Sequence, residues 1–385
     1  MTKQEFEKQL ISWRHQLHRF PEAAFEETET ALFIAEKLRE MGISVTTGIG
    51  KTGIVGTLKC GNGDRCIALR SDIDSLKINE KGTHDHVSEH PGRMHACGHD
   101  GHITTLLGAA LLMSQAKDFN GTVHFIFQPA EEPGTGAKAM INDGLFDRFR
   151  IDEIYGLHNA PFLPAGKVRT RAGGFAASED DFTIHITGKG GHASSPHEGV
   201  DPLACFAEMY MAFQTIVSRN ARPAHPVVIS CTEIETDGAH NAIPTHVTVR
   251  GDTRCYFPED QALVETRMRR LAESICEMNG AQCAFEYTHE FWPVVNDAVC
   301  VERLAKAASM VVGEDNIEAD GEQWTVSEDF AMYLDHVPGC LFLLGSGRYE
   351  GDTSLHDNTF DYNDDVLAIG AEIWHELIRQ RLQIG

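Results

Sequence analysis

The stretch DDFTIHITGKG, residues 180–190, alternates apolar and polar side chains and so predicts a half-buried β-strand. Five further elements follow it in the order helix, strand, strand, helix and strand, at about 202–220, 226–237, 245–257, 259–279 and 281–291. A β-α-β-β-α-β order is the signature of a ferredoxin-like α+β unit. This stretch therefore marks the start of a separate four-stranded domain, which we place at residues 179–290.

Helices and strands alternate on both sides of this domain. The expected helices lie at about 4–19, 28–41, 103–116, 134–148, 297–312 and 364–383, and the expected strands at 53–60, 65–74, 122–128, 151–159 and 340–346. Such alternation predicts an α/β domain with a mixed or parallel sheet, whose functional groups gather on loops at strand ends. We expect one α/β domain, residues 1–178 plus 291–385, interrupted by the inserted domain. The Asn62-Gly63 pair between the strands at 53–60 and 65–74 predicts a β-hairpin.

The charge of the chain restricts its partners. With a net charge of −24 and a pI near 5.2, the 385 residues have no basic excess to neutralise nucleic-acid phosphates or to bind anionic membranes. No stretch approaches the roughly 18 apolar residues of a membrane-spanning helix, and the first 20 residues lack the apolar core of a signal peptide. The ten cysteines form no CxxC pair, which is typical of reduced thiols. We expect a cytoplasmic protein without a nucleic-acid or membrane partner.

The stretch MHACGHDGH, residues 94–102, concentrates side chains that can do chemistry. Cys97 and His99 flank a glycine between an expected strand and an expected helix. Thiolate and imidazole are ligands for zinc, nickel or cobalt more than for magnesium. Taken alone, the stretch is compatible with a metal site, with a thiol nucleophile and its base, or with a polar loop.

Three other strand-end segments offer metal-compatible side chains. Glu131 and Glu132 end the strand at 122–128, His158 ends the strand at 151–159, and His356 precedes the last helix. Each segment by itself is weak evidence for a metal site, since a glutamate pair, for example, is also typical of a helix N-terminus. Together they offer five candidate ligands and a spare carboxylate. A structural zinc needs only four ligands, so the set favours a hydrolytic site with two metal ions.

Motifs over the whole length carry a resemblance to a known family. They are PEAAFEE (21–27), LRSDID (69–74), MHACGHDGH, QPAEE (128–132), GLHN (156–159), GKGGHAS (188–194), NAIP (241–244), SEDFA (327–331) and LHDNTFDYN (355–363). In this order the chain resembles the di-metal aminoacylase/carboxypeptidase family of metallopeptidases, in the amidohydrolase branch that contains hippurate hydrolase and the indole-acetyl-amino-acid hydrolases. Lys77 departs from the proline that relatives tend to have after LRSDID, which leaves that loop uncertain.

The resemblance implies a role for each candidate in the α/β domain. Cys97 matches the position that bridges the metals, which is an aspartate in the carboxypeptidase branches, and His99, Glu132, His158 and His356 match the other ligands. Glu131 matches the general base, which takes a proton from a metal-activated water and gives it to the leaving amine. The side chains of His95, Asp100 and His102 would support the loop from outside the metal shell, and those of Asp72 and Asp74 would be structural.

The inserted domain resembles the lid of the family, which also forms dimers. His192 matches a histidine that stabilises the oxyanion and that can come from the partner subunit. Asn241 and Arg254 match residues that hold the substrate carboxylate. A homodimer is therefore expected, with a tetramer as an alternative.

These observations predict an amidohydrolase that uses two divalent ions (zinc, manganese, nickel or cobalt) to remove the acyl group from an N-acyl amino acid or a similar small conjugate. Two alternatives stay open. A dipeptidase or carboxypeptidase of the same family would need a carboxylate near a free substrate amine, and we identify none. A non-catalytic binding protein on the same fold would have no need of Glu131.

Overall fold

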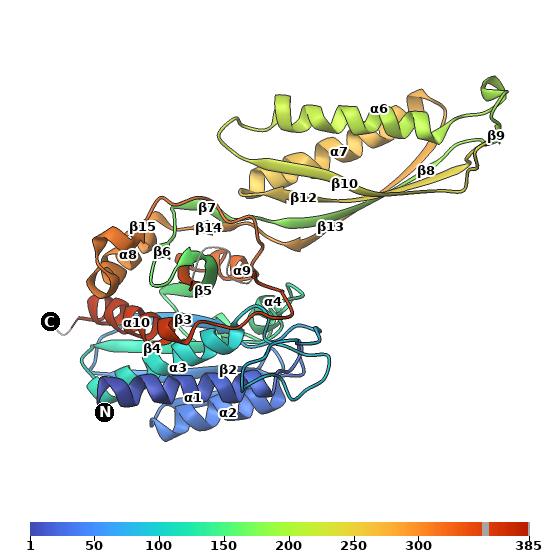
Figure 1. The fold of residues 1–385 in the computed structure, drawn as a ribbon. Coiled ribbons are helices and arrows are strands. Elements are labelled where there is room, and N and C mark those ends of the chain that lie inside the picture. The colour runs from blue at the N-terminus through green and yellow to red at the C-terminus, as the bar shows by residue number, and fades with distance from the viewer. Residues whose placement is uncertain (349–353, 384–385) are drawn as a thin grey trace. The chain divides into compact units, whose positions relative to one another are not determined.

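The computed structural model describes residues 1–348 and 354–383. The chain divides into two compact units. Unit 1 comprises Met1–Phe175, Val295–Glu322 and Asp329–Gly385, and unit 2 comprises Ala176–Val294 and Gln323–Glu328. The expected combination of a mixed-sheet α/β domain with an inserted ferredoxin-like α+β domain is confirmed (Figure 1).

Unit 1 is built on an eight-stranded mixed sheet with the order β1-β2-β4-β3-β5-β16-β6-β15. Its strands are β1 (Ser44–Ile49), β2 (Gly53–Cys60), β3 (Cys66–Asp72), β4 (Gly121–Gln128), β5 (Glu153–Pro164), β6 (Val168–Arg169), β15 (Ile317–Glu318) and β16 (Gly339–Gly347). The four central strands β4, β3, β5 and β16 run parallel to their neighbours within this group. Parallel strands bury both faces, which explains their continuous apolar sequences.

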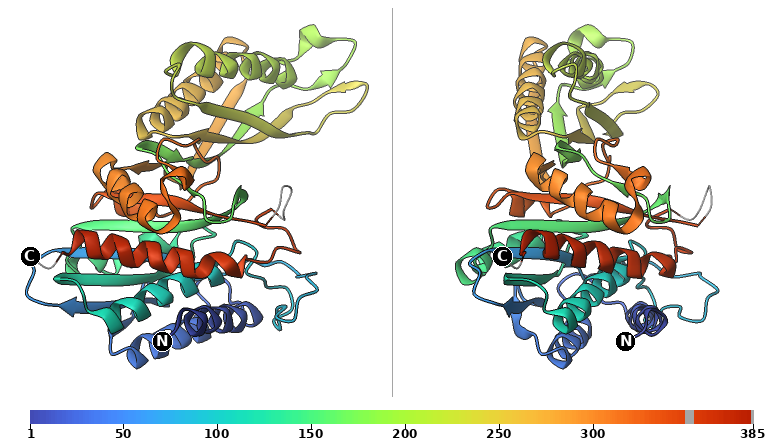
Figure 2. Two further views of the ribbon diagram at one scale, coloured as in Figure 1. Left: turned by 60° about the vertical axis from the view of Figure 1, so that its left-hand side comes forward. Right: turned by 90° about the vertical axis from the view of Figure 1, so that its left-hand side faces the viewer.

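The helices of unit 1 are α1 (Lys3–Arg19), α2 (Thr28–Glu40), α3 (His99–Ala116), α4 (Gly136–Asn142), α5 (Leu145–Arg148), α8 (Ala298–Val312), α9 (Ala331–Leu334) and α10 (Leu367–Arg381), with the 3-10 turns η3 (Glu314–Asn316) and η4 (Asp364–Val366). The largest apolar core joins α1, α2, α3, α8 and α10 to alternate residues of β4, namely Val123, Phe125 and Phe127. Figure 2 shows α10 lying along the sheet. Alternation with a period of two residues is what a strand requires to present one face to these helices.

The β-hairpin predicted around Asn62-Gly63 is wrong. Strands β2 and β3 do not pair with each other, because β4 lies between them and pairs with both. The amides of Asn62 and Gly63 both donate hydrogen bonds to Oδ1 of Asn120, just before β4, at 2.9 and 2.7 Å. The turn is therefore closed by a residue from a distant part of the chain, which the local sequence does not reveal.

Unit 2 contains a four-stranded antiparallel sheet with the order β10-β12-β8-β13. Its strands are β8 (Glu179–Thr187), β10 (Val227–Thr236), β12 (His246–Cys255) and β13 (Gln282–Phe291), and its helices are α6 (Pro202–Thr215), continued by the π-helix η2 (Ile216–Asn220), and α7 (Pro258–Met278). In chain order this is β-α-β-β-α-β, as predicted from the stretch at 180–190. The core lies between the sheet and the two helices, with Ile184, Phe213 and Val264 buried.

The remaining strands are short. β9 (Gly191–His192), followed by the 3-10 turn η1 (Pro196–Glu198), pairs with β11 (Ala242–Ile243), and β7 (Gly173–Ala176) pairs with β14 (Val294–Asn296). The segment Gln323–Glu328 belongs to unit 2, whereas the limits expected from the sequence left it with the α/β domain. It is held there by bonds from the Ala177 amide to the carbonyls of Trp324 and Val326. No helix in the described ranges has the length and apolar character that crossing a membrane requires.

Candidate metal centre

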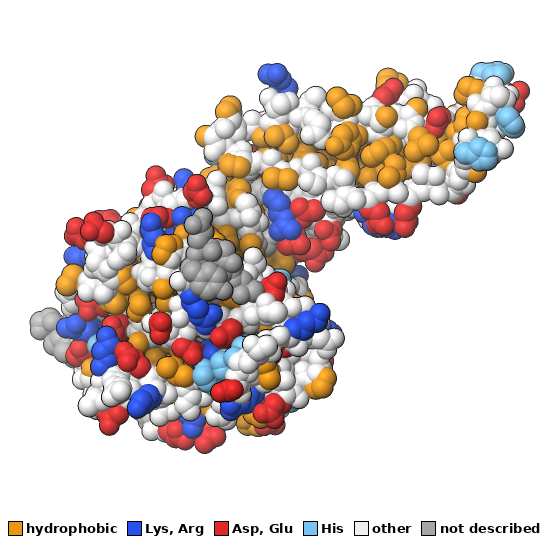
Figure 3. All heavy atoms as spheres, viewed as in Figure 1, with side chains coloured by type: hydrophobic (Ala, Val, Ile, Leu, Met, Phe, Trp, Pro, Cys, Tyr) orange, Lys and Arg blue, Asp and Glu red, His pale blue; other side chains and the backbone are white. Residues whose placement is uncertain are grey.

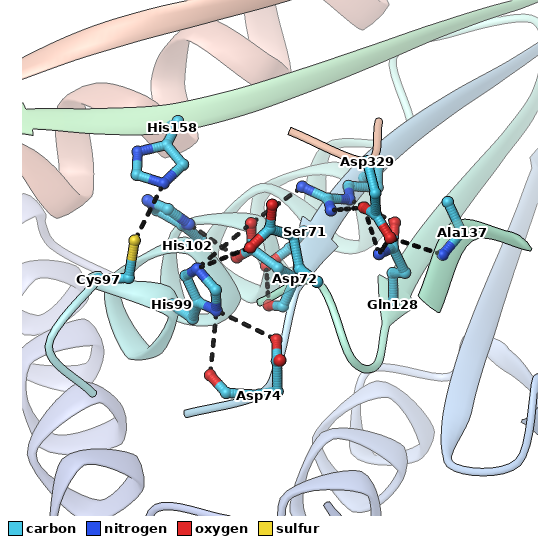
Figure 4. A network of polar contacts seen from close by, with 12 residues as sticks. Ser71, Asp72, Asp74, Cys97, His99, His102, Gln128, Ala137, His158 and Asp329 are labelled. Carbon is cyan, nitrogen blue, oxygen red and sulfur yellow. Dashed lines mark hydrogen bonds and ion pairs between the residues drawn. The ribbon is translucent and has the colours of Figure 1, made fainter. Parts of the chain in front are cut away.

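The loop at residues 94–98 and the first turn of α3 position Cys97 and His99. Gly98 between them has φ of +90°, a conformation that favours glycine, and a Cβ atom there would lie 2.7 Å from Oδ1 of Asn159. The helix begins at His99 itself, four residues earlier than predicted. This sharp turn directs both side chains to the same side of the loop (Figure 4).

The five side chains expected to bind metal come together in two groups. Potential ligand atoms of Cys97, His99 and His158 all lie within 4.8 Å of one another, and so do those of Cys97, Glu132 and His356. The first group is fully buried, whereas the His356 side chain is 51% exposed. Cys97 is the one member common to both groups.

The His99 ring is oriented by Asp74. Its Nδ1–H donates to the backbone carbonyl of Asp74 at 3.0 Å, so Nε2 is the nitrogen whose lone pair can bind a metal ion when it carries no proton. Nε2 is buried and has no hydrogen-bond partner among the described residues. It lies 3.8 Å from a carboxylate oxygen of Asp72 and 3.9 Å from those of Glu131 and Glu132. A buried lone pair facing three carboxylates is suited to a cation between them.

The other two histidines are oriented in a similar way. Nδ1–H of His158 donates to the carbonyl of Asn159 at 2.8 Å, and its Nε2 lies 3.4 Å from Sγ of Cys97. His356 has φ of +65°, and its amide donates to the carbonyl of Ala96 at 2.8 Å. Its Nε2 lies 3.5 Å from Oε2 of Glu132. A backbone contact thus fixes the His158 ring, whereas for His356 it is the backbone that is held next to the Cys97 loop.

Glu131 and Glu132 follow β4 through a strained turn. Ala130 has φ of +50°, and its amide donates to the buried carboxylate of Glu27 at 2.9 Å. The Glu132 amide donates to the Asp74 carboxylate at 3.1 Å. The two glutamate side chains are therefore held at the same site, with Glu131 only 6% exposed.

The electrostatics of the site favour a bound cation. Burial, together with the charge of Glu132, raises the pKa of the Cys97 thiol well above its ordinary value. Burial would lower the pKa of His99, but the Asp72 carboxylate and the hydrogen bond to Asp74 outweigh it and raise this pKa. The pKa of His158 is lowered by burial and by His102. Thiolate, imidazole and carboxylate donors crowded in one buried site fit transition-metal ions, which would compensate this negative charge.

A second layer of charged side chains supports the centre (Figure 4). His102 donates from Nδ1 to Asp72 at 2.7 Å, and its Nε2 accepts from the Asn159 amide at 2.9 Å, so both ring nitrogens are taken. Asp72 also accepts from Arg70 at 2.9 Å, and Arg70 reaches Asp329 at 3.0 Å. Asp329 accepts hydrogen bonds from Gln128 and from the Ala137 amide at the start of α4.

Asp100 and His95 lie on the other side of the loop. Oδ2 of Asp100 accepts from Nδ1 of His18 at 2.8 Å and lies 3.5 Å from Nη1 of Arg14. Burial lowers the pKa of His95 to about 4, so its ring is neutral. Neither nitrogen of that ring has a hydrogen-bond partner within the described part of the chain.

The candidates of the inserted domain lie in unit 2. His192 and Asn241 are neighbours, because β9 pairs with β11 and the Ala193 amide donates to the Asn241 carbonyl at 3.0 Å. Histidine side chains gather at this end of unit 2 in Figure 3. Nδ1 of His192 accepts from the Ser194 hydroxyl at 2.8 Å.

Arg254 lies near the other end of β12. Its guanidinium makes a two-fold contact with Asp252, at 3.0 Å for both atom pairs. It also donates to Glu179 at 2.9 Å and to Ser327 at 2.7 Å. The guanidinium is thus held by partners within unit 2.

Several residues that support the centre are not among those predicted from the sequence to have a role in it. Glu27 is the last residue of PEAAFEE, Asn159 the last of GLHN, and Asp329 the third of SEDFA. Their position in motifs that carry the family resemblance is the sequence signal that could have identified them. What each carboxylate or amide contacts could not be deduced, because the partners lie far away in the sequence.

Comparisons with known proteins agree with this geometry. Residues 68–380 match the model of peptidase family M20/M25/M40. The chain is 36% identical to hippurate hydrolase of Campylobacter jejuni, over 98% of this chain and 97% of that protein. It is also 36% identical to N-acetyl-L-cysteine deacetylase of Bacillus subtilis, over 98% and 89%. Among solved structures it is similar to a dinuclear metal binding peptidase from the M20 family of Bacillus subtilis, with a TM-score of 0.86 and 31% identity over 99% of both chains.

Proposed function

The chain belongs to peptidase family M20/M25/M40, and from this premise we propose that it is a metal-dependent amidohydrolase of N-acyl amino acids or similar small conjugates. The observation that carries the proposal is the pair of donor groups that share Cys97, with Glu131 beside them. Relatives that act on hippurate and N-acetyl-L-cysteine suggest a small acyl group as the part removed.

We propose that two divalent ions would be held by these side chains, one by Cys97, His99 and His158 and the other by Cys97, Glu132 and His356. When bound, such ions polarise the amide carbonyl and lower the pKa of a water molecule. The sulfur and nitrogen donors favour zinc, nickel or cobalt, with manganese as a further candidate. His102 and Asp74 would keep the ligands in place without touching the ions, since their polar atoms already contact protein groups.

Glu131 is the proposed general base. It is buried, follows the strained turn at Ala130, and places Oε2 3.9 Å from Nε2 of His99. Oε2 would take a proton from the attacking water and deliver it to the nitrogen of the leaving amine. Proton transfer of this kind contributes about 10²–10⁴-fold to a reaction rate.

The geometry of unit 2 supports a contribution from a second subunit. Arg254 lies eight positions after His246 on β12, which is ~27 Å of strand, and β9 with His192 lies beyond the His246 end. One small substrate cannot contact His192 and Arg254 of the same chain. We therefore propose a homodimer in which His192 and Asn241 act at the metal centre of the partner subunit. Arg254 would bind the substrate carboxylate, which would replace the Glu179 carboxylate as a partner of its guanidinium.

All ten cysteines are free thiols in the structure. This is in line with a reducing compartment, and the cytoplasm is the location we propose.

The test is hydrolysis of a panel of N-acetyl and N-benzoyl amino acids beside unblocked dipeptides, with zinc, manganese, nickel and cobalt supplied in turn. Glu131→Gln should keep its metal ions and lose about 10²–10⁴-fold in kcat, whereas Glu302→Gln, at an exposed position on α8, should match the wild type. Near-wild-type turnover by the Glu131 variant would refute its role as base. Preference for the unblocked dipeptides would refute the proposed substrate class.

A further inference from the structure

Unit 1 contains a second group of metal-compatible side chains that shares no residue with the catalytic candidates. It joins three parts of the chain: His18 of α1, the loop segment that carries Glu80, His84 and His86, and Asp361, which precedes α10. Figure 3 shows histidine side chains beside acidic ones on this face of unit 1. The proposed function uses none of these residues.

The five side chains converge in two overlapping sets. Potential ligand atoms of His18, Glu80 and His84 lie within 4.8 Å of one another, and so do those of His84, His86 and Asp361. Oε1 of Glu80 is 3.0 Å from Nε2 of His84 and 3.2 Å from Nε2 of His18. Oδ1 of Asp361 is 2.9 Å from Nε2 of His86. His84 belongs to both sets and stands at the centre of the group.

The imidazoles of this group stack closely on one another. The rings of His84 and His86 stack with their centroids 3.9 Å apart, and His86 stacks on His15 at 3.7 Å. Two cationic rings at this separation repel each other. Nδ1 of His84 is buried and has no hydrogen-bond partner in the described ranges, although imidazole nitrogens in such surroundings normally have one. Imidazole binds a metal ion through a nitrogen lone pair, and this nitrogen of His84 has no hydrogen-bond partner among the described residues to occupy it.

The group also carries excess negative charge. Four carboxylates meet there, those of Glu80, Asp100, Asp361 and Asp364. Two guanidinium groups offset them, that of Arg14 and that of Arg348, which lies 3.0 Å from Asp361. Four carboxylates against two guanidinium groups leave two negative charges, which either protonated histidines or a metal ion can compensate. One divalent ion carries the matching charge.

The charge of Arg14 does not prevent cation binding here. Its guanidinium is paired with two carboxylates, that of Asp361 at 2.9 Å and that of Asp364 at 2.6 Å. It also lies 2.7 Å from Nε2 of His86. The side chains of His84 and Asp361 are 17% and 22% exposed, which leaves an ion access from solvent.

We propose that His84, His86 and Asp361, with Glu80 and His18, form a third divalent-metal site with a structural role. Imidazole and carboxylate donors suit zinc, nickel or cobalt. An ion there would tie α1 and the loop at 80–86 to the segment that begins at His356, and so hold two of the loops that shape the catalytic centre. The site contains no sulfur, which distinguishes it from the centre around Cys97.

The test is the number of metal ions per chain. Full-length protein is loaded with excess zinc, desalted into metal-free buffer and measured by mass spectrometry of the metal. We expect three ions in the wild type and two in His84→Ala/His86→Ala. The matched control is His90→Ala/His375→Ala, which removes two half-buried histidines of unit 1 that lie in neither set and should keep three. Cys97→Ala, which alters only the catalytic centre, should retain the ion of the third site.

Cobalt gives a second readout that does not depend on the fold of the double variant. Cobalt bound near Cys97 shows a sulfur-to-metal charge-transfer band, whereas cobalt at the third site adds visible d–d absorption without that band. Titration of the wild type should therefore show one equivalent with d–d absorption only, and this equivalent should be missing in the single variant His84→Ala. Equal metal content in the wild type and in both His84 variants would overturn the proposal, even if the catalytic centre binds two ions as proposed.

Discussion

Substitution of Gly98 by alanine is expected to damage the fold and the metal centre together. Gly98 has φ of +90°, and an alanine in the left-handed region costs about 1–2 kcal/mol. The added Cβ would lie 2.7 Å from Oδ1 and 2.9 Å from Nδ2 of Asn159. The Asn159 side chain, whose Oδ1 lies 2.7 Å from Nε2 of His102, would have to move away, and a buried hydrogen-bonding group left without its partner costs about 1–3 kcal/mol. The total expected loss of unfolding free energy is about 2–5 kcal/mol.

Gly42 provides the matched control. It has φ of +73°, but a Cβ atom there would meet nothing within 4 Å, so Gly42→Ala carries the backbone strain without the collision. Its expected cost is about 1–2 kcal/mol. Both glycines belong to unit 1, so the same transition in chemical denaturation of the chelator-treated protein reports both variants. Competition with a chromophoric chelator then measures zinc affinity, which should fall in the Gly98 variant only.

Two results would contradict this reasoning. Equal destabilisation by the two variants would show that contact with Asn159 adds nothing to the strain at Gly98. Wild-type zinc affinity in Gly98→Ala would show that the turn between Cys97 and His99 does not determine how the metal is held.

Three further changes test other contacts of unit 1. Glu153→Ala removes the carboxylate that Arg381 and Arg303 contact at 2.8 and 2.9 Å and should cost about 2–3 kcal/mol. Burial raises the pKa of Glu153, but Arg381 and Tyr155 outweigh it and lower the pKa below 4.5. The contribution of Glu153 to stability is therefore fully present above its unfolded-state pKa and is lost as the pH falls through its folded-state pKa. The urea midpoints of variant and wild type should therefore converge in acid and stay apart at pH 7. His102→Ala should weaken zinc binding about 10–100-fold in the chelator assay, and an unchanged affinity would exclude His102 from holding the centre. Asn120→Ala removes the acceptor of the amides of residues 62 and 63 and should lower the free energy of unfolding, measured by urea denaturation, by about 1–2 kcal/mol. The zinc content should not change, and a loss of zinc would contradict this prediction.

Local sequence patterns predicted the elements well where local contacts determine them. The alternation in β8 and the helical periodicity of α7 follow from which face each element buries, and the order of elements then fixed the ferredoxin-like topology. The pairing of β2 and β3 was predicted wrongly, because the position of β4 between them depends on contacts 57 and 58 residues apart in sequence. The assignment of Gln323–Glu328 to unit 2 was missed for the same reason.

The candidate site was predictable to the extent that its residues lie in short motifs. Cys97, His99, Glu132, His158 and His356 could be chosen by side-chain chemistry and by resemblance, and the structure brings them into two groups. The orienting contacts could not be predicted in this way. Glu27 and Ala130 are 103 residues apart, and Arg70 and Asp329 are 259 apart, so no spacing in the sequence reveals these pairs.

The stretch MHACGHDGH shows why the residues between ligands matter as much as the ligands. Gly98 allows the turn that directs Cys97 and His99 to one side, and a Cβ at Gly101 would lie 2.3 Å from the Tyr362 ring. Asp100 ties the loop to α1 through His18, and His102 ties it to β3 through Asp72. Asp100 and His102, which do not face the metal site, thus contact two different elements. Because a loop with free conformations would lose entropy on binding an ion, these contacts prepare the centre before the ions arrive.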